Sequence, residues 1–420
     1  MKRFIYFFFS CIITGSNGFY THFYYYSTHF FQSKGNGKII MKICAIICEY
    51  NPFHNGHLYQ LREARERSGA DAVLCLMSGN FVQRGESAII DKYTRARQAI
   101  EAGEDIVLEL PTVFATSNAE LFAKGGIKLL SSIPAVTSLC FGAESANKTA
   151  FLLAARALND EPKEVSDKIK ELAASGVSYA KARAQAWAGF IPFDLLCSPN
   201  NILGLEYTRA LLSQNSDIEI LPIERIGGGY NDRALQENYS SATAIRSALV
   251  NGESVCGNLP VFVEKDLPCT LENTLEVLEK YALLSSSAEE ISRVCDCTEG
   301  LENALKKAAA SDETLVNALT SARYTSSRIR RIALQNLLKI DEALIRESLS
   351  APLYLRVLAI KKDRSDLMSA LGQSSFPLIA RAHDDNALSD VAKRCYERDI
   401  FAEKVYGLLY GGVAKRNIFI

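Results

Sequence analysis

The chain has 420 residues, a formal net charge of −1, 48% hydrophobic residues and 23% charged residues. These values are ordinary for a folded globular protein of two or three domains, and they require any basic, nucleic-acid-binding face to be local. The eleven cysteines are an odd number scattered singly through apolar runs, which favours free thiols in the cytoplasm over a disulfide framework.

Residues 1–40 differ from the rest of the chain, because they contain 13 aromatic residues and no Asp or Glu. Their charged start and the apolar run from Phe4 to Ile13 resemble a signal peptide, but no small-residue cleavage site follows. We interpret 1–40 as a leader outside the fold, either disordered or an upstream extension of a chain that starts at Met41. No later run reaches the about 18 apolar residues that a membrane span needs, so no membrane partner is expected.

The apolar run Ile43–Cys48 does not alternate with polar residues, which is typical of a strand buried on both faces of a parallel sheet. A proline and then Gly56 turn the chain into a helix predicted from about His57 to Ser68. The start of such a helix directs unpaired N–H groups and a partial positive charge beyond the strand end, which suits a phosphate. His54 and His57 bracket this turn.

The His54-x-Gly56-His57 quartet has two other interpretations. It could arise by chance, but its place at the carboxyl end of a strand, where doubly wound α/β proteins bind ligands, favours a function. A metal site fits less well, because the two histidines lack the i, i+4 spacing of a helical pair and no third ligand is near. Cys295-x-Cys297 also lacks the spacing of a zinc knuckle, so no metal site is predicted.

Strand and helix signals continue to alternate. Apolar runs at 71–77, 105–110 and 135–141 predict three more strands, separated by helices over 91–102 and from Asn118 to about Leu130. Single helices between strands imply right-handed crossovers, and therefore a doubly wound parallel α/β sheet. A polar loop follows each strand at the same edge of this sheet.

Beyond this unit, residues 147–188 predict two or three helices, and Asn200 or Asn201 is expected to cap a helix that runs to Leu212. A short strand at 218–223 then leads to Arg225 and a run of glycines. Near 240 another helix begins with several hydroxyls, either as a simple N-cap or as donors to a phosphate chain.

From 266 onward the strand signals fade, and helices are predicted at 271–284, 289–294, 301–310 and 312–322. The stretch 321–331 then carries Arg323, Arg328, Arg330 and Arg331 beside Tyr324, without an acidic residue. Such a run is either a solvated helix face or a means of gripping phosphodiesters and stacking on unpaired bases.

Two motifs far apart in the chain point to a family. His54-x-Gly56-His57 with Ser240-Ser241-x-Thr243-x-Ile245-Arg246 resembles the motif pair of the HIGH-type nucleotidyltransferase superfamily. The string Glu-Tyr-Asn-Pro-Phe-His-Asn-Gly-His at 49–57, with Met-Ser-Gly at 77–79, Gln-Arg-Gly-Glu at 83–86, Phe-Gly-x-Glu at 141–144 and Pro-Asn-Asn-Ile-Leu-Gly at 199–204, resembles the bacterial tRNA(Met) cytidine acetate ligase family over residues 41–420.

That resemblance implies a Rossmann-like nucleotidyltransferase domain at 41–265 that binds ATP, followed by a helical, tRNA-binding domain at 266–420. It implies activation of acetate as acetyl-adenylate and transfer of the acetyl group to N4 of the wobble cytidine of elongator tRNA(Met). His54 and His57 would donate to the α- and β-phosphates, Ser241 and Arg246 would hold the pyrophosphate, and Mg²⁺ would bridge the phosphates. The expected ATP-binding residues are Ile47, Glu49, Tyr50, Asn51, Pro52, Phe53, Asn55, Gly56, Leu58, Gln60, Gly142, Asn200 or Asn201, Arg225, Ile226, Ser241, Thr243 and Arg246.

For the tRNA, we hypothesise that Arg323, Arg328, Arg330 and Arg331 grip the anticodon stem-loop. Two alternatives stay open. One is adenylyl transfer to a phosphorylated metabolite by an enzyme with the same motif pair, although such enzymes are typically compact single domains. The other is a non-catalytic RNA-binding protein on a degenerate nucleotide fold, which the intact histidines and Arg246 disfavour.

Overall fold

The computed structural model describes residues 14–15, 18–19, 41–177, 179–227, 235–268, 274–321, 323–381, 383–412 and 418–420. The chain divides into two units, Met1–Ile40 and Met41–Ile420. In the first unit, β1 (Thr14–Gly15) and β2 (Gly18–Phe19) pair in antiparallel fashion. Parts of two predicted features, the glycine run after 227 and the start of the helix at 271, lie outside the described residues.

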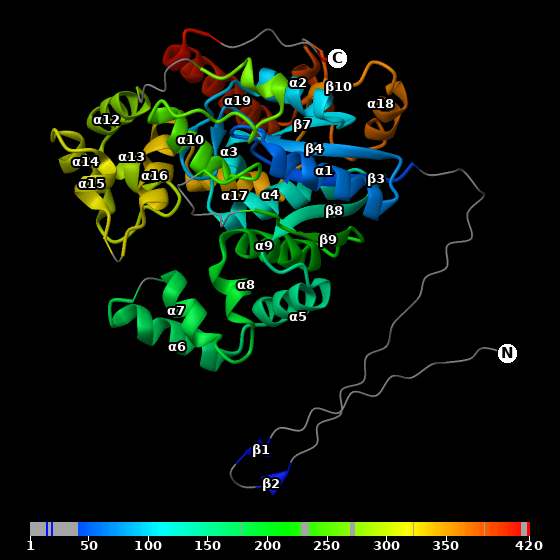
Figure 1. The fold of residues 1–420 in the computed structure, drawn as a ribbon. Helices are drawn as coiled ribbons and strands as arrows, with labels where there is room; N and C mark the ends of the chain where they lie inside the picture. The colour runs from blue at the N-terminus through cyan, green and yellow to red at the C-terminus, as the bar shows by residue number, and fades with distance from the viewer. Residues whose placement is uncertain are drawn as a thin grey trace. The chain divides into compact units, whose positions relative to one another are not determined.

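The second unit is built on a seven-stranded sheet in the order β11-β10-β7-β4-β3-β8-β9 (Figure 1). The strands are β3 (Ile43–Cys48), β4 (Ala72–Ser78), β7 (Ile106–Leu110), β8 (Val136–Ala143), β9 (Glu219–Glu224), β10 (Leu355–Ile360) and β11 (Leu378–Ile379). All neighbouring pairs are parallel except β10 and β7. The predicted doubly wound α/β fold is confirmed, with a switch of strand order at β3 between β4 and β8.

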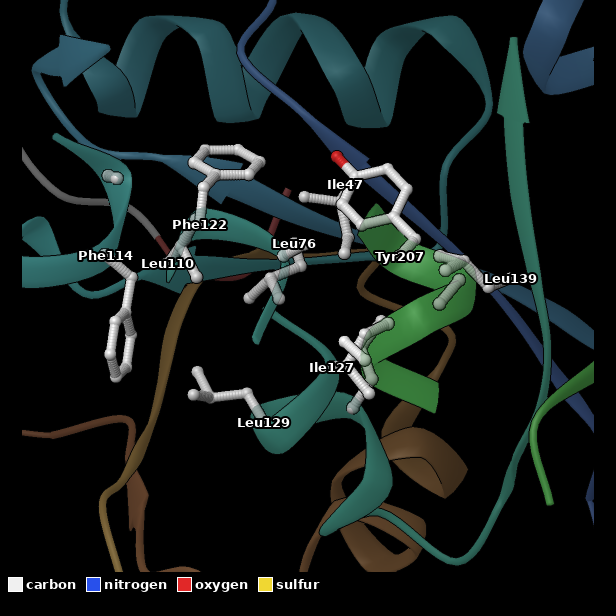
Figure 2. Packing of buried hydrophobic residues seen from close by; sticks show 14 of the residues in the cluster. Ile47, Leu76, Leu110, Phe114, Phe122, Ile127, Leu129, Leu139 and Tyr207 are labelled. Atoms are coloured by element: carbon white, nitrogen blue, oxygen red, sulfur yellow. The ribbon is translucent and has the colours of Figure 1, made fainter. Parts of the chain in front are cut away.

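Helices cover both faces of the sheet, which is why β3 and β4 are apolar throughout. On one face α1 (Asn55–Ser68), α2 (Lys92–Ala102), α10 (Ala242–Val250) and α11 (Val261–Glu264) pack on the sheet. On the other lie α3 (Thr112–Ala115), α4 (Ala119–Ser131), α9 (Pro199–Ser213), α17 (Glu342–Ser350) and α19 (Asp390–Tyr410). Figure 2 shows Ile47 and Leu76 of the strands packed among Phe122, Ile127 and Tyr207 of these helices.

Capping side chains set the helix ends where the sequence predicts them. Asp91 caps α2 by accepting from the backbone amides of Tyr93 and Thr94, and Gly103 ends that helix in the left-handed conformation. Asn118 caps α4 in the same way. The helix at 199–213 differs, because Pro199 occupies its first turn and Ser198 precedes it, so neither Asn200 nor Asn201 is its cap.

Two further groups of helices flank the sheet. The three helices found between 147 and 188, of the two or three predicted, are α5 (Lys148–Asn159), α6 (Lys163–Ala174) and α7 (Tyr179–Ala186), and α8 (Phe193–Cys197) leads from them to α9. A second group contains α12 (Leu275–Ser285), α13 (Ala288–Ser292), α14 (Leu301–Ala309), α15 (Leu315–Leu319) and α16 (Ser326–Leu338) and has its own apolar core (Figure 1).

Residues 266–420 are mostly helical, as expected, but they also supply β10 and β11 to the sheet, together with α18 (Ser365–Leu371) and the short turn η1 (Asp384–Ala387). The strand β10 is not predicted from the sequence, because Arg356 interrupts its apolar run. That guanidinium is 2% exposed and lies 2.8 Å from the Glu109 carboxylate of β7, so its charge is compensated inside the sheet. No described helix is both long and apolar enough to cross a membrane.

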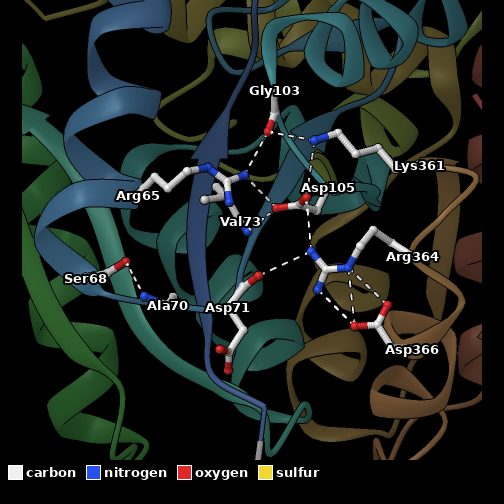
Figure 3. Close-up of polar contacts among 10 residues, drawn as sticks. All are labelled: Arg65, Ser68, Ala70, Asp71, Val73, Gly103, Asp105, Lys361, Arg364 and Asp366. Carbon is white, nitrogen blue, oxygen red and sulfur yellow. Dashed lines mark hydrogen bonds and ion pairs between the residues drawn. The ribbon is translucent and has the colours of Figure 1, made fainter.

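Asp105, just before β7, ties three distant segments together (Figure 3). Its carboxylate accepts from the Val73 amide at 2.8 Å and from Arg65 of α1 at 2.7 Å, and it lies 3.2 Å from Arg364. Burial raises the pKa of Asp105, but these donors outweigh burial and hold it below its usual value. The end of β10 is thus fixed to the amino-terminal part of the unit by charge as well as by the sheet.

Candidate active site

Two histidines build the turn between β3 and α1. His54 is the N-cap of α1, and its Nδ1 accepts a hydrogen bond from the Gly56 amide at 3.0 Å. In return, Nδ1 of His57 accepts from the His54 amide at 3.3 Å, so the pair forms a capping box. The two rings stack with centroids 3.7 Å apart. Gly56 is required there, because a Cβ atom would lie 2.9 Å from Cε1 of His54.

The hydrogen bonds also fix the protonation of both imidazoles. Since each Nδ1 accepts, the ring proton of each neutral histidine is on Nε2. Burial, aided by Arg225 and Arg246, lowers the pKa of His54 to about 3. Burial and the neighbouring His54 also lower the pKa of His57 well below its usual value. At neutral pH the site therefore holds two uncharged Nε2–H donors.

The expectation that α1 offers free backbone amides to a phosphate is wrong for this turn. The Asn55 amide donates to the carbonyl of Asn258 at 3.1 Å, and the Gly56 amide is satisfied by His54. The acceptor of the Gly56 amide is therefore the His54 side chain, and this amide is not available to a ligand. The imidazole Nε2–H groups, rather than the peptide N–H groups, are the donors that remain at this end of α1.

The start of α10 is more open. Ser241 is its N-cap and accepts from the Ala244 amide at 3.1 Å. The amides of Ala242 and Thr243, in the first turn, make no hydrogen bond to any described residue. Both residues line a cavity at the carboxyl ends of β3 and β8. The helix that can present backbone donors and its positive end to an anion is therefore α10.

A cavity of about 340 Å³ lies at the carboxyl ends of β3 and β8, between α1, α9 and α10. It brings together residues that are up to 199 positions apart in the sequence. The predicted site residues that line it are Ile47, Glu49, Tyr50, Asn51, His54, His57, Gln60, Gly142, Asn200, Arg225, Ser241, Thr243 and Arg246. A smaller adjoining pocket of about 30 Å³ adds Gly56 and Ile226.

Five predicted residues do not line either pocket, because they hold the surrounding backbone. Phe53 is fully buried, and its ring packs against Tyr50 with centroids 4.7 Å apart. Asn55 donates its side-chain amide to the Gly257 carbonyl at 2.8 Å. The other three are the buried Pro52, the half-buried Leu58, whose side chain packs into the core beside α2, and Asn201.

The structure distinguishes Asn200 from Asn201. Asn201 is fully buried, and its Oδ1 accepts from the amides of Glu144 and Ser145 at 2.9 and 3.3 Å. Asn200 lines the cavity, and its Nδ2 donates to the Glu144 carboxylate at 2.6 Å. Asn201 therefore shapes the loop after β8, and Asn200 is the asparagine that a ligand can reach.

Sequence reasoning missed a short hairpin that closes one side of the cavity. It consists of β5 (Phe81–Val82) and β6 (Glu86–Ser87), and its tip contributes Gln83, Arg84 and Glu86. Phe141 and Tyr207 complete the apolar wall and were missed as well. The available signal was the polar loop after β4, which leaves the sheet at the same edge as the histidine turn.

Arg246 connects the histidine turn to this hairpin. Its Nη1 donates to the Asn51 carbonyl at 2.8 Å, and its Nη2 lies 3.6 Å from the Glu86 carboxylate. Glu49, which is half-buried on the cavity wall, accepts from the Gln83 amide at 2.7 Å, and desolvation raises its pKa. The site thus combines neutral imidazole donors with the Arg246 and Arg225 guanidiniums, which is a set suited to phosphate groups.

Comparisons with known proteins agree with this geometry. The family described as HIGH Nucleotidyl Transferase matches residues 41–418. A tRNA(Met) cytidine acetate ligase of Caldanaerobacter subterraneus subsp. tengcongensis is 37% identical over 394 residues, which cover 89% of this chain and 97% of the relative. The chain belongs to the tRNA(Met) cytidine acetate ligase family. The resemblance inferred from the motifs is confirmed.

Other members of this ligase family give the same result. The ligase of Acetivibrio thermocellus is 34% identical, with 90% of this chain and 97% of the relative covered. The apo crystal structure of Thermotoga maritima TmcAL superimposes with a TM-score of 0.82 at 29% identity, covering 90% of this chain and all of that one. A crystal structure of the same protein bound with alpha-thio ATP gives a TM-score of 0.80 at 30% identity and the same coverage.

The four arginines proposed to contact RNA do not share one face of this ligase. Arg323 is the most exposed, at 62%, and lies 3.6 Å from Glu299. The guanidinium of Arg330 donates to Glu86 at 2.8 Å. Arg328 donates to the Asp296 carbonyl, and Arg331 is only 12% exposed, with its pKa lowered by burial. Arg328 and Arg331 therefore hold α16 against the 296–298 loop.

Proposed function

We propose that the chain is an ATP-dependent tRNA(Met) cytidine acetate ligase, which activates acetate as acetyl-adenylate and acetylates N4 of the wobble cytidine of elongator tRNA(Met). The observation that carries this proposal is the cavity itself, where the His54–His57 pair meets Arg246 and Arg225 at the carboxyl ends of β3 and β8. The ligase relatives, matched over nearly their whole length, support the choice of reaction.

ATP is proposed to lie with its phosphates between α1 and α10. The Nε2–H groups of His54 and His57 donate to the α- and β-phosphates from one side. Arg246, Ser241 and the open amides of α10 hold the β- and γ-phosphates from the other. The adenosine half extends along Ile47 and Gln60 toward Gly142 and Asn200. The alpha-thio ATP complex of the T. maritima protein supports a nucleotide in this fold.

The first chemical step needs no nucleophile from the enzyme. An acetate oxygen attacks the α-phosphorus in line, the bond from that phosphorus to the bridging oxygen breaks, and pyrophosphate leaves with the electron pair. The contribution of the protein is to position the reactants and to stabilise the developing charge. The Nε2–H groups of His54 and His57 are already held in place by the capping box, so they meet that requirement without reorganisation.

In the second step the N4 lone pair attacks the acetyl carbonyl carbon, and the bond from that carbon to the phosphate oxygen breaks. AMP leaves with the electron pair, and N4 gives up one proton. The cytosine must be unstacked from its neighbours to reach the adenylate. This requirement places the RNA-contacting surface next to the cavity rather than on a distant face.

We expect Mg²⁺ to accompany ATP on its phosphate oxygens. The two carboxylates that line the cavity do not form a ready metal site, because Glu49 accepts from Gln83 and Glu86 lies between Arg246 and Arg330. No cluster of three His, Cys, Asp or Glu side chains suited to a metal is found within the described ranges.

For the tRNA, the proposal assigns Arg323 and Arg330 to phosphodiester contacts, on a helical region within 266–420. Arg328 and Arg331 are reassigned from RNA contacts to positioning α16, because their guanidiniums already serve the 296–298 loop. We further propose that the protein works in the cytoplasm, where unpaired thiols such as Cys44 and Cys140 stay reduced.

Incubation of the purified protein with labelled acetate, ATP and either bulk tRNA or no RNA tests the proposal. We expect acetate-dependent exchange of pyrophosphate into ATP in both reactions, and label in RNA only when tRNA is present. Adenylylation of a phosphorylated metabolite without any acetate dependence would overturn the assignment. RNA binding without exchange would point to a non-catalytic protein.

A further inference from the structure

A second cavity adjoins the proposed ATP site. Its volume is about 270 Å³, close to the about 300 Å³ at which small-molecule pockets begin. Glu86 and Arg246 line both cavities, so these two side chains form the boundary between them. The remaining walls come mostly from α12, α15, α16 and the end of α19, within residues 266–420.

The walls of this second cavity are about equally polar and apolar, and they include a fixed aromatic ring. Leu275, Leu315 and Ile329 line it. Tyr410 also lines it, and its hydroxyl lies 2.8 Å from the Ser87 hydroxyl of the hairpin, which fixes the position of the ring. Flat apolar surfaces with an aromatic side chain are how proteins hold an unstacked base.

One carboxyl oxygen in this cavity makes no hydrogen bond to any residue that the structure describes. Glu279 is 6% exposed, and its Oε1 atom is buried without a hydrogen bond to any described residue. Its neighbour Glu276 differs, because its Oε1 accepts from the Leu315 amide at 2.6 Å. Burial and the charge of Glu276 raise the pKa of Glu279 well above its usual value, against the opposing effect of Arg330.

A neutral carboxyl group presents one donor and one acceptor side by side. The Watson–Crick edge of cytosine presents an acceptor at N3 beside a donor at N4, so the two edges are complementary. Arg330, which lines the same cavity, is 37% exposed and can reach the phosphodiester that flanks such a base. The apolar side chains beside Tyr410, the unpaired carboxyl and the adjacent guanidinium together describe a site for one nucleotide of a single strand.

We propose that this second cavity receives the unstacked target cytosine and that Glu279 hydrogen-bonds its N3 and N4 edge. This inference rests on the proposed function, since it places the acceptor base beside the adenylate site. Glu279 is then a specificity-determining residue for the transfer step, and it takes no part in adenylate formation.

Two substitutions of Glu279 test whether its carboxyl group pairs with the cytosine edge. Glu279→Leu removes both the donor and the acceptor, so transfer of acetyl from preformed acetyl-adenylate to tRNA in a single turnover is expected to fall by about tenfold or more. Glu279→Gln restores one donor and one acceptor, and its transfer rate is expected to stay within a few-fold of the unmodified protein. Equal defects in the two variants, or none in Glu279→Leu, would overturn the pairing.

A second test does not disturb the buried carboxyl. Val250 lines the cavity but is 68% exposed, so Val250→Trp can fill the entrance without repacking a core. Transfer to tRNA is expected to fall, and acetate-dependent pyrophosphate exchange is expected to persist. Val277→Trp on α12 is the matched control, because Val277 is 67% exposed and does not line the cavity.

The two proposals fail in different ways. If the unmodified protein shows neither exchange nor acetylation of tRNA, the proposed function is wrong and the cytosine site falls with it. If the unmodified protein is active and Val250→Trp transfers acetyl at the same rate, only the cytosine site is wrong.

Discussion

The Glu86 carboxylate accepts a hydrogen bond from Arg330 at 2.8 Å, across 244 positions of sequence. Its other oxygen lies 3.6 Å from Arg246, which lines the proposed ATP cavity. One acidic side chain thus stands between a guanidinium proposed to hold ATP and another proposed to contact tRNA. A change of position at either arginine can be transmitted to the other through this carboxylate.

Gly85→Ala is expected to loosen the junction between the hairpin and α16. Gly85 has φ of +74°, and an added Cβ would lie 2.5 Å from the Arg331 amide nitrogen and 2.6 Å from the Arg330 carbonyl carbon. Backbone atoms cannot move aside as a side chain can, so we expect a loss of about 3 kcal/mol in the free energy of unfolding. Urea denaturation measures this loss. Gly69→Ala, at φ of +57° with open space around it, is the control for backbone strain alone.

Arg246→Ala is expected to weaken ATP binding by about thirtyfold, because a guanidinium that is hydrogen-bonded to charged phosphates contributes about 2 kcal/mol. Isothermal titration with a non-hydrolysable ATP analogue checks this value. Arg97→Ala, at a half-buried position of α2 that lines neither cavity, serves as the control. Unchanged affinity in Arg246→Ala would remove this arginine from the nucleotide site.

The neighbouring asparagines are expected to respond differently to alanine. Asn201→Ala leaves the amides of Glu144 and Ser145 without their acceptor, and should lower the free energy of unfolding by about 2 kcal/mol. Asn200→Ala should leave stability nearly intact and raise the Kd for the ATP analogue. Thermal unfolding with and without the analogue separates the two effects. The reverse pattern would contradict the assignment of Asn200 to the ligand.

The arginines of the 321–331 stretch are expected to fall into two groups. Arg323→Ala should raise the KM for tRNA and reduce the salt dependence of binding by about one counterion, with little change in stability. Arg331→Ala should instead lower stability by about 2 kcal/mol, since its guanidinium is mostly buried and lies 3.7 Å from Asp296. Filter binding over a series of salt concentrations, with parallel urea melts, distinguishes these results.

The histidine pair that caps α1 makes the free energy of unfolding depend on pH. His54 has a pKa of about 3 in the folded protein, below its usual 6.5, so the unfolded chain binds the proton more readily. The contribution of His54 to the free energy of unfolding is therefore complete above about pH 6.5 and is lost as the pH drops toward 3. From His54 alone we expect a loss of about 2 kcal/mol between pH 7 and pH 5.

His54→Asn tests this dependence, because asparagine also caps helices but does not titrate. Urea melts at pH 7 and pH 5 should show a smaller difference for the variant than for the unmodified protein. An identical difference in both proteins would assign the acid sensitivity to other buried groups.

Periodicity and capping chemistry predicted the amino-terminal half of the fold well. The strand Ile43–Cys48 has the predicted bounds, and the helices predicted to begin at Asp91 and Asn118 have these residues as their N-caps. Those features depend on residues close together in the sequence. The strand at 355–360 was missed because a buried arginine contradicts an apolar pattern, and its compensation by Glu109 is visible only in three dimensions.

The candidate site shows the same limit. The histidine turn and the Ser241–Arg246 helix start were found because each is a local motif, and the structure brings both to one cavity. The backbone amides that bind a phosphate were wrongly assigned to α1, because the sequence does not show that the His54 ring accepts a hydrogen bond from the Gly56 amide. Glu86 and Tyr207 were missed because each joins the site only through the folded arrangement.

The place of β10 in the sheet affects how the protein is made. This strand, at 355–360, lies between β7 and β11, so that side of the sheet stays open until most of the polypeptide has been synthesised. During translation β7 is left with an unpaired edge, and such edges invite pairing with other nascent chains. The protein should therefore be sensitive to early release from the ribosome, and fragments that end near 265 should aggregate.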